Sequence, residues 1–418
     1  MRGEVVPAGR SAAALDGVAR RRVSGARPST VRAINDRVAL QLLLQHGTLT
    51  RTQLATLTGL SKPTAAQLLH RLTEAGLIVP RGTTSGAPGP NAQLFALNER
   101  AAHVAAVDVD EHRVTASVAD LTGRTLAELS EEVDYTQPED PVPSVRRLLG
   151  DACRRGGLKL RELDQVVLGV PAAYDAATDR LTFADHIPGW AQPRTLSRLR
   201  TALRTDLVVE NDVKLAAVWE RSHGAAREVA SFALLWAGTG LGLSVDLGGA
   251  PYTGATGGAG EIGYMRLGLR PAAGGEPPPR FHDLVGIEAV TELAAEHGLP
   301  AGPGAAVAAA RQDLAHGMPF LSELARRIAG GLGPIVAVLD PPLVVLAGPT
   351  CVPGGEVLAQ LVGEELRAIS PFEPRIAVSQ VQGSPVLQGG LDSGLARVRG
   401  RLFGGPASGD GAARREAP

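Results

Sequence analysis

The stretch from Val208 to Met265 constrains the fold more than any other part of the chain. A short apolar strand, residues 207–209, is followed by Asn211 and Asp212 and then by a helical run from Val213 to Arg221. In open α/β sheets, ligands collect at the carboxyl ends of the strands. The sequence therefore predicts an α/β fold with a ligand site at the end of this strand.

Two glycine-rich segments are expected at the same site. Three glycines surround Thr239 on a predicted tight turn between two apolar strands, namely Gly238, Gly240 and Gly242. Backbone N–H groups on such a turn can approach an anion closely. Glu261 lies in the second glycine-rich segment and, with the Asn-Asp pair, offers the acceptors and donors that a sugar requires. Each motif on its own has an alternative interpretation: the Asn-Asp pair can be a helix cap, and the glycine-rich segment an ordinary turn.

Length and composition bound the class of protein. The 418 residues suggest roughly three domains of ~100 to 200 residues each, and a hydrophobic content of 44% suffices for globular cores. The two cysteines, Cys153 and Cys351, have no metal-binding spacing, which favours a reducing, cytoplasmic setting. No run approaches the ~18 apolar residues of a membrane span, and the N-terminus lacks a secretory signal.

The near-zero net charge hides an asymmetry between a basic N-terminal part, residues 1–97, and an acidic remainder of the chain. Residues 1–97 hold twelve Arg or Lys and four Asp or Glu, a net charge of +8, so the remaining residues carry −9 to give the total of −1. A basic front on an acidic body indicates a polyanion partner for the front alone. Residues 1–28 lack periodicity and are expected to form a disordered basic arm.

Residues 29–98 carry the pattern of a winged helix-turn-helix. Thr50 is expected to cap a short helix that ends at Leu57, Gly59 makes a turn, and Ser61 caps a second helix that extends to Ala75. Strands at 77–80 and 93–97 would form the wing. A small helical dimerisation or protein-binding module is the alternative, and the basic charge argues against it.

The second helix would enter the major groove of DNA with its polar face. The residues expected to reach bases or phosphates from this helix are Ser61, Lys62, Thr64, Gln67 and Arg71. Arg51 and Thr52 would anchor the backbone, and Arg81 lies at the base of the wing. One short helix reads few bases, so a homodimer or tetramer on a palindromic operator is expected.

The body of the chain contains a weak internal repeat. Strands are expected at 104–107, at 114–118 and ending near Leu129, and the same order of strands and turns returns at 232–256. Such a repeated β-meander predicts two similar lobes that face a cleft.

These motifs, in this order, resemble the ROK family of repressors, uncharacterised reading frames and sugar kinases, over roughly residues 30–400. The resemblance implies a winged helix-turn-helix followed by a two-lobed actin-like, ribonuclease-H-like sugar-kinase fold in 99–400. The first lobe would extend to about residue 210, and 401–418 would be a tail. Asn211 and Asp212 match the family's sugar-holding pair, in which the Asp is the general base of the kinases. Glu261 matches a second sugar carboxylate.

Several departures from the family pattern argue against kinase activity. Family kinases have two glycines where this chain has Asp110 and Glu111, and two unit charges ~4 Å apart repel by ~4 kcal/mol at an effective dielectric of ~20. ATP binding is therefore expected to be lost. The family's sugar-site histidine is replaced by Tyr264, and its zinc-binding cysteine loop by the cysteine-free stretch 267–281. No zinc is expected, and Asp283 would represent the family's acidic residue after that loop.

The sequence therefore predicts a cytoplasmic DNA-binding transcriptional regulator, usually a repressor in this family, and not an enzyme. Its effector would be a sugar or sugar derivative, with Asn211, Asp212, Glu261, Tyr264 and Asp283 as contacts, and no cofactor is expected. Two alternatives remain at this stage. One is an active ATP-dependent sugar kinase, and the other is an effector-independent dimeric DNA binder. The tip of the wing, 85–90, lacks the family's usual arginine, so contact of the wing with DNA rests on Arg81.

Overall fold

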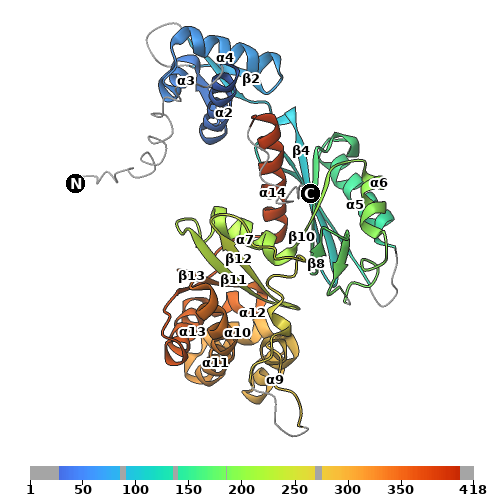
Figure 1. Ribbon diagram of the computed structural model, residues 1–418, viewed down its shortest axis with the longest axis vertical. Helices are drawn as coiled ribbons and strands as arrows, with labels where there is room; N and C mark the ends of the chain where they lie inside the picture. The colour runs from blue at the N-terminus through green and yellow to red at the C-terminus, as the bar shows by residue number, and fades with distance from the viewer. Residues whose placement is uncertain (1–27, 85–90, 135–139, 185, 269–274, 405–418) are drawn as a thin grey trace, which may run out of the picture. The chain divides into compact units, whose positions relative to one another are not determined.

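The computed structural model describes residues 28–84, 91–134, 140–184, 186–268 and 275–404 (Figure 1). The chain divides into two compact units. Among the described residues, the first unit consists of 28–103, 120–124 and 396–404, and the second unit contains the others. The arm expected at 1–28 lies outside the described residues except for Pro28, and the expected tail is described only to residue 404. No described helix is long and apolar enough to cross a membrane.

The N-terminal part of the first unit is a winged helix. Its elements are α2 (Pro28–His46), β1 (Thr48–Thr50), α3 (Arg51–Thr58), α4 (Lys62–Glu74), β2 (Ile78–Thr83) and β3 (Gln93–Leu97). The three strands form an antiparallel sheet in the order β1-β3-β2. The predicted helices and the two wing strands are confirmed. Strand β1 was not predicted, because three residues give no periodicity and the strand exists through its pairing with β3.

Local capping fixes the helix-turn-helix. The Thr50 hydroxyl accepts the N–H of Gln53 at 3.2 Å, and the Gln53 side chain accepts the N–H of Thr50 at 2.8 Å, which together form a capping box. Gly59 ends α3 in the left-handed conformation, with φ of 68°, which an L side chain rarely adopts. The Ser61 hydroxyl then accepts the N–H of Thr64 at 3.3 Å and starts α4. The sequence signals for both caps were therefore sufficient.

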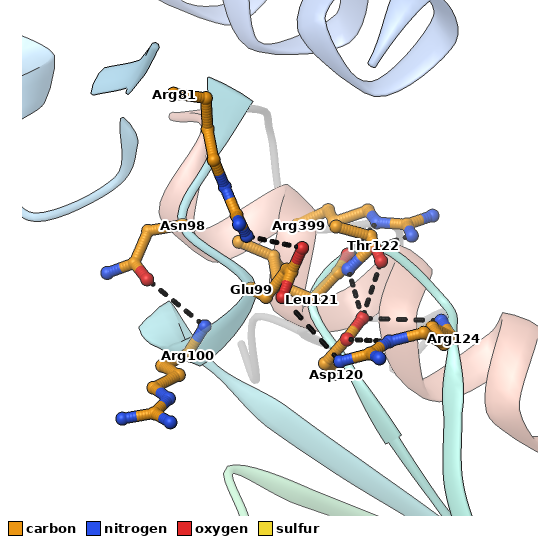
Figure 2. Close-up of polar contacts among 9 residues, drawn as sticks. All are labelled: Arg81, Asn98, Glu99, Arg100, Asp120, Leu121, Thr122, Arg124 and Arg399. Carbon is orange, nitrogen blue, oxygen red and sulfur yellow. Dashed lines mark hydrogen bonds and ion pairs between the residues drawn. The ribbon is translucent and has the colours of Figure 1, made fainter. Parts of the chain in front are cut away.

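A chain of polar contacts joins the base of the wing to the turn between β5 (Arg113–Asp120) and β6 (Thr125–Glu132), as Figure 2 shows. Arg81 Nη2 donates to Glu99 Oε1 at 2.7 Å. Arg124 lies on the other side of Glu99, with its Nη2 3.6 Å from Glu99 Oε2 and its Nε 3.2 Å from an Asp120 oxygen. Glu99 is thus held between two arginines, one from the wing and one from a distant turn.

The last helix in the described part of the chain ends near this same turn. Helix α14 (Pro385–Leu402) carries Arg399, whose Nη2 and Nε donate to the carbonyl oxygen of Leu121 at 2.9 and 3.1 Å (Figure 2). The helix begins in the second unit and ends in the first. The first unit is therefore built from three separate parts of the sequence.

Among its described residues, the second unit contains two large sheets and one separate two-stranded hairpin. The first has the order β10-β7-β4-β5-β6, in which β4, β7 and β10 are parallel and β5 and β6 antiparallel. The three parallel strands are β4 (His103–Val109), β7 (Gln165–Val170) and β10 (Leu207–Asn211). The same part of the chain also contains the hairpin β8 (Ala173–Asp175) and β9 (Arg180–Thr182) and the helices α5 (Pro141–Arg155) and α6 (Thr195–Leu203). Helix α5 packs on β6 and on α6, over a core of buried aliphatic side chains.

The second sheet has the order β12-β11-β13-β14. Its strands are β11 (Ser231–Ala237), β12 (Leu241–Leu247), β13 (Leu343–Ala347) and β14 (Arg375–Val378). The accompanying helices are α8 (His282–Val285), α9 (Ile287–Glu296), α10 (Pro303–Gln312), α11 (Leu314–Leu339), α12 (Gly348–Cys351) and α13 (Gly355–Ile369). The strand predicted at 343–347 is confirmed, and two mixed sheets in one unit agree with the predicted two-lobed α/β fold.

The predicted repeat of the meander is wrong in one respect. The segment directly after β12, residues 251–256, forms no strand of this sheet and contributes only an isolated bridge between Asp246 and Pro251. Single hydrogen bonds from the glycine-rich segment occupy the edge of β12 instead, including one from the N–H of Leu243 to the oxygen of Gly260 at 2.9 Å. Glycines supply the turns of this segment but little propensity for a strand.

Two helices connect the lobes of the second unit. Helix α7 (Asp212–His223) contacts β7 and β10 of the first sheet and β11 and β12 of the second. Helix α14 packs against α7 so closely that a Cβ on Gly389 would lie 1.8 Å from the carbonyl oxygen of Leu215. A Cβ on Gly390 would lie 2.9 Å from a side chain of β4. Glycine is thus required where the helix backbones meet.

Candidate functional site

The first unit presents a polar face on its helix-turn-helix. Arg51 and Thr52 are exposed at the start of α3, and four predicted contact residues are exposed on α4, namely Ser61, Lys62, Thr64 and Gln67. The opposite face of α4 is buried through Ala65, Leu68, Leu69 and Leu72. The structure thus leaves the predicted recognition face uncovered within its unit, and its contact with DNA stays a prediction.

Two of the predicted DNA contacts are engaged in ion pairs. Arg71 Nη2 lies 2.6 Å from an oxygen of Asp36 in α2, and Arg81 is bonded to Glu99 at the wing base. Of the two cations predicted on α4, Lys62 alone has no ion pair among the described residues. Lys62 is therefore the side chain of α4 best placed to meet a phosphate without first breaking a protein contact.

The second unit contains a cavity of about 430 Å³, lined from both of its sheets. This volume falls in the ~300 to 1,000 Å³ range of pockets that hold drug-sized ligands. All five predicted effector residues line it, namely Asn211, Asp212, Glu261, Tyr264 and Asp283. They come from three segments that are distant in sequence. Their role as effector contacts stays a prediction, but their convergence in one cavity is a finding.

Asn211 and Asp212 lie where β10 ends and α7 begins. Asn211 caps α7, since its side-chain oxygen accepts the N–H of Lys214 at 3.2 Å, and its amide nitrogen donates to the oxygen of Ala172 at 3.4 Å. The carboxylate of Asp212 accepts the N–H of Val213 at 2.8 Å. The structural role suggested by the sequence thus coexists with exposure to the cavity, and these bonds fix the direction of both side chains.

A glycine positions Glu261 at the same end of the cavity. Gly260 has φ of 102°, and a Cβ at this position would lie 1.8 Å from the carbonyl oxygen of Leu243. The segment can therefore approach β12 only with glycine at this point. Lys214 lies deeper, 2% exposed, and its Nζ donates to the oxygen of Gly257 at 2.6 Å. The ammonium group thereby ties the glycine-rich segment to α7.

Burial raises the pKa of three carboxyl groups in this region, and repulsion between carboxylates adds to the shift at Asp108 and Asp212. Burial raises the pKa of Asp212 to about 8, and nearby carboxylates, first among them Asp108, add to the shift. Burial, followed by the charge of Asp110, raises the pKa of Asp108 to about 7. Burial also raises the pKa of Glu261, while Lys214 opposes the shift. A protonated carboxyl both donates and accepts hydrogen bonds, which suits sugar hydroxyls.

The turn between β4 and β5 uses two of its backbone N–H groups within the protein. The N–H of Asp110 donates to the oxygen of Arg113 at 2.8 Å, and the N–H of His112 donates to the Asp110 carboxylate at 3.2 Å. Two backbone donors of the turn are thus used inside the protein. Glu111, from the same turn, lines the cavity with its acidic side chain. The turn therefore contributes an acidic side chain, and no arginine or lysine, to the lining of the cavity.

The wall of the cavity includes residues that no sequence motif indicated. Tyr264 lies with its ring centroid 5.1 Å from that of Phe183, and the guanidinium carbon of Arg280 lies 5.5 Å from the Tyr264 centroid. Asp283, which was predicted, accepts the backbone N–H of Arg280 at 2.7 Å. Phe183 and Arg280 belong to no motif, because what brings them to Tyr264 is the tertiary fold. His186, Trp236 and His282 also line the cavity.

Comparisons with known proteins agree with both parts of this description. Residues 104–364 match the ROK family, and residues 32–79 match the winged helix-turn-helix DNA-binding family. The xylose repressor of Bacillus spizizenii is 21% identical over 57% of this chain and 61% of its own length. The chain spans about three fifths of the length of the curated relatives that it matches first.

Solved structures share the fold. A ROK family transcriptional regulator, described as a homologue of the Escherichia coli Mlc protein, is 16% identical, and the match covers 90% of this chain and 100% of the other with a TM-score of 0.66. The ROK hexokinase from Thermus thermophilus is 23% identical over 71% of this chain and 99% of the other, with a TM-score of 0.57. At these identities the likeness establishes the fold.

The fold and the cavity together define a class of protein, in which a winged helix precedes a two-lobed body of the sugar-kinase type. The predicted actin-like fold class and its N-terminal winged helix-turn-helix are thereby confirmed. Because the family match covers more than half of the chain, this protein belongs to the ROK family.

Proposed function

We propose that this protein is a cytoplasmic DNA-binding transcriptional regulator, acting as a repressor, whose ROK domain binds a sugar or sugar derivative without phosphorylating it. One observation carries the proposal. A winged helix is joined to a cavity that has hydroxyl-binding carboxyl and amide groups but an acidic turn in place of a phosphate-binding one. A relative named as a xylose repressor and a similar structure named as a transcriptional regulator support both halves.

The recognition helix in this proposal is α4. Its exposed polar face would lie in the major groove, with Lys62 on a phosphate and Thr64 and Gln67 near base edges, while the start of α3 contacts the backbone. A helix of 13 residues reads few base pairs. A homodimer that places two copies of α4 on a palindrome supplies the missing specificity, because the two half-sites are read together.

The electrostatics of the cavity support the binding of a sugar that is not phosphorylated there. Burial raises the pKa of Asp212 to about 8, so this carboxyl can donate as well as accept a hydrogen bond near neutral pH. A bound phosphate would add charge beside Asp110 and Glu111, at a cost of about 4 kcal/mol for two unit charges ~4 Å apart. Sugar hydroxyls carry no such charge and exchange hydrogen bonds with a neutral carboxyl.

Regulation requires that the effector change the affinity for DNA. An effector that binds one arrangement of the lobes better than another shifts the population toward that arrangement, and typical coupling energies are ~1 to 3 kcal/mol. Operator affinity would then change by ~5- to 150-fold. This range is wide enough to measure at equilibrium.

The test begins with selection of a bound sequence from random double-stranded DNA. Its affinity for the full chain is then measured by fluorescence anisotropy with and without pentoses, hexoses and acetamido sugars. We expect one sugar to lower the affinity by at least ~5-fold. Asp212→Asn and Glu261→Gln should remove this response and keep DNA binding. Glu356→Gln, an exposed carboxylate in the first turn of α13, is the matched control and should respond like the wild type.

The retained Asp212 and Thr239 favour an active sugar kinase as the second candidate function. ATP consumption measured with the same sugars separates the two, and turnover would overturn the non-catalytic proposal. If operator affinity responds to no sugar, and both cavity variants regulate like the wild type in the cell, the effector-independent DNA binder is the correct description.

A further inference from the structure

Three side chains form a stack on one wall of the cavity. Phe183 follows β9, Tyr264 ends the 3-10 helix 262–264, and Arg280 precedes α8. The rings of Phe183 and Tyr264 are tilted by 44° with their centroids 5.1 Å apart, and the Arg280 guanidinium lies over the Tyr264 ring. A cation over an aromatic ring at this distance is attracted by the ring's quadrupole and restrains its orientation. The wall is therefore an ordered aromatic surface built from three separate segments.

Packing of the protein core does not account for these two rings. Phe183 is 45% exposed and Tyr264 is 48% exposed, whereas Trp190 and Phe281 are at most 2% exposed. Phe183 also has φ of 59°, a left-handed conformation that is unfavourable for a bulky side chain. A strained backbone that carries a solvent-exposed ring lowers stability, so its position at a cavity wall indicates contact with a ligand.

The aromatic wall and the polar end belong to the same cavity. Asn211, Asp212 and Glu261 line it together with the stacked residues, and its volume is about 430 Å³. A single sugar ring that used the polar groups would leave an apolar surface exposed beside it. Among the described residues the Arg280 guanidinium has no carboxylate partner, so its N–H groups can also donate to a ligand.

We infer that the effector has two rings, of which one is a sugar held by Asn211, Asp212 and Glu261 and the second lies against Phe183 and Tyr264. This inference rests on the proposed sugar-binding function and names the class of sugar derivative. The second ring is an aromatic aglycone or a second sugar, since both offer an apolar face to an aromatic side chain. Monosaccharides occupy the polar end alone and bind more weakly.

Paired ligands with the same sugar test the inference. Isothermal titration of the full chain compares the methyl glycoside, the phenyl glycoside and a disaccharide of each sugar in a panel of pentoses, hexoses and acetamido sugars. For the sugar that binds, we expect the phenyl glycoside or the disaccharide to bind at least ~10-fold more tightly than the methyl glycoside. Which of the two binds more tightly distinguishes an aromatic aglycone from a second sugar.

Variants assign the preference to the stack. Phe183→Ala and Tyr264→Ala should reduce the affinity ratio of the two-ring ligand to the methyl glycoside toward one. Phe183→Asn removes the ring with a residue that tolerates positive φ, so it tests the same contact with less backbone strain than Phe183→Ala. Tyr252→Ala removes a tyrosine of similar exposure, 54%, that does not line the cavity, and it should keep the wild-type ratio.

The outcomes separate this inference from the proposed function. Equal affinity for methyl and two-ring glycosides in the wild type overturns the two-ring effector and leaves sugar binding in place. A preference that survives both Phe183 variants and Tyr264→Ala also overturns it, because the stack would not be its source. If no glycoside binds and none changes the affinity for DNA, the sugar-responsive function itself is overturned.

Discussion

Replacement of Asp212 by Asn should make the protein more stable than the wild type at alkaline pH. The folded state raises the pKa of this carboxyl from 3.8 to about 8. Between these two values the folded chain holds a proton at Asp212 that the unfolded chain has released. The folded state therefore binds more protons, and its free energy of unfolding falls as the pH rises. The fall in the free energy of unfolding is complete once the pH exceeds the pKa of Asp212 in the folded state.

The magnitude follows from proton linkage. A difference of one bound proton changes the free energy of unfolding by about 1.4 kcal/mol per pH unit, or at most ~2.7 kcal/mol from about pH 6 to about pH 8. Asp212 is partly exposed to the cavity and is coupled to Asp108, so we discount this limit to about 1 to 2 kcal/mol. Asn keeps the oxygen that accepts the N–H of Val213 and cannot ionise. In the variant this part of the pH dependence should disappear.

The assay is thermal unfolding from about pH 6 to about pH 9 in buffers of matched ionic strength. With ~2 to 4 °C per kcal/mol for a large domain, the wild type should lose roughly 2 to 8 °C more than Asp212→Asn between about pH 6 and pH 8. Asp283→Asn, which removes an exposed carboxylate from the same cavity, should follow the slope of the wild type. Parallel curves for the wild type and Asp212→Asn would refute the linkage argument.

Three further predictions concern DNA binding and helix packing. Lys62→Ala should weaken non-specific DNA binding and reduce the slope of log K against log salt by ~0.9 for each phosphate that this side chain neutralises. An unchanged slope would show that Lys62 does not contact a phosphate. Glu99→Gln, which frees two arginines at the wing base, should cost less than ~1 kcal/mol in urea unfolding and steepen that slope; a shallower slope would contradict it. Gly389→Ala should lower the free energy of unfolding by about 1 to 3 kcal/mol or more, because its Cβ would meet the oxygen of Leu215. Gly400→Ala is the control on the same helix: its Cβ meets nothing within 4 Å, so the change should be neutral or stabilising. Equal effects of the two glycine variants would show that the close packing of α14 is unimportant.

Several elements of the fold are determined by residues that are close to each other in the sequence. Thr50, Gly59 and Ser61 fix the helix-turn-helix through caps and a left-handed turn, and these depend on residues within a few positions of each other. The end of β10 and the start of α7 are equally local, because Asn211 caps the helix that follows it. Such features could be predicted from the sequence and were confirmed.

The parts that could not be predicted depend on distant contacts. Strand β1 exists because Thr48 to Thr50 pair with β3, and three residues carry no period of their own. The expected third strand after β12 is absent from the described sheet, since isolated hydrogen bonds take its place. Phe183 has a left-handed backbone that its neighbours in sequence do not predict, and the contact of Arg280 with Tyr264 joins residues that lie in no common motif. The polar end of the cavity could be predicted, whereas its aromatic wall could not.

The position of α14 has a consequence for how the protein is made. A ribosome releases the chain from the N-terminus, so the recognition helix emerges long before Arg399, which anchors the oxygen of Leu121 in the same unit. The first unit is therefore completed only after all described strands of the second unit have been synthesised. A chain truncated before residue 396 keeps its recognition helix but lacks this anchor. In the proposed regulator, an incomplete chain would therefore carry a first unit that lacks one of its internal contacts.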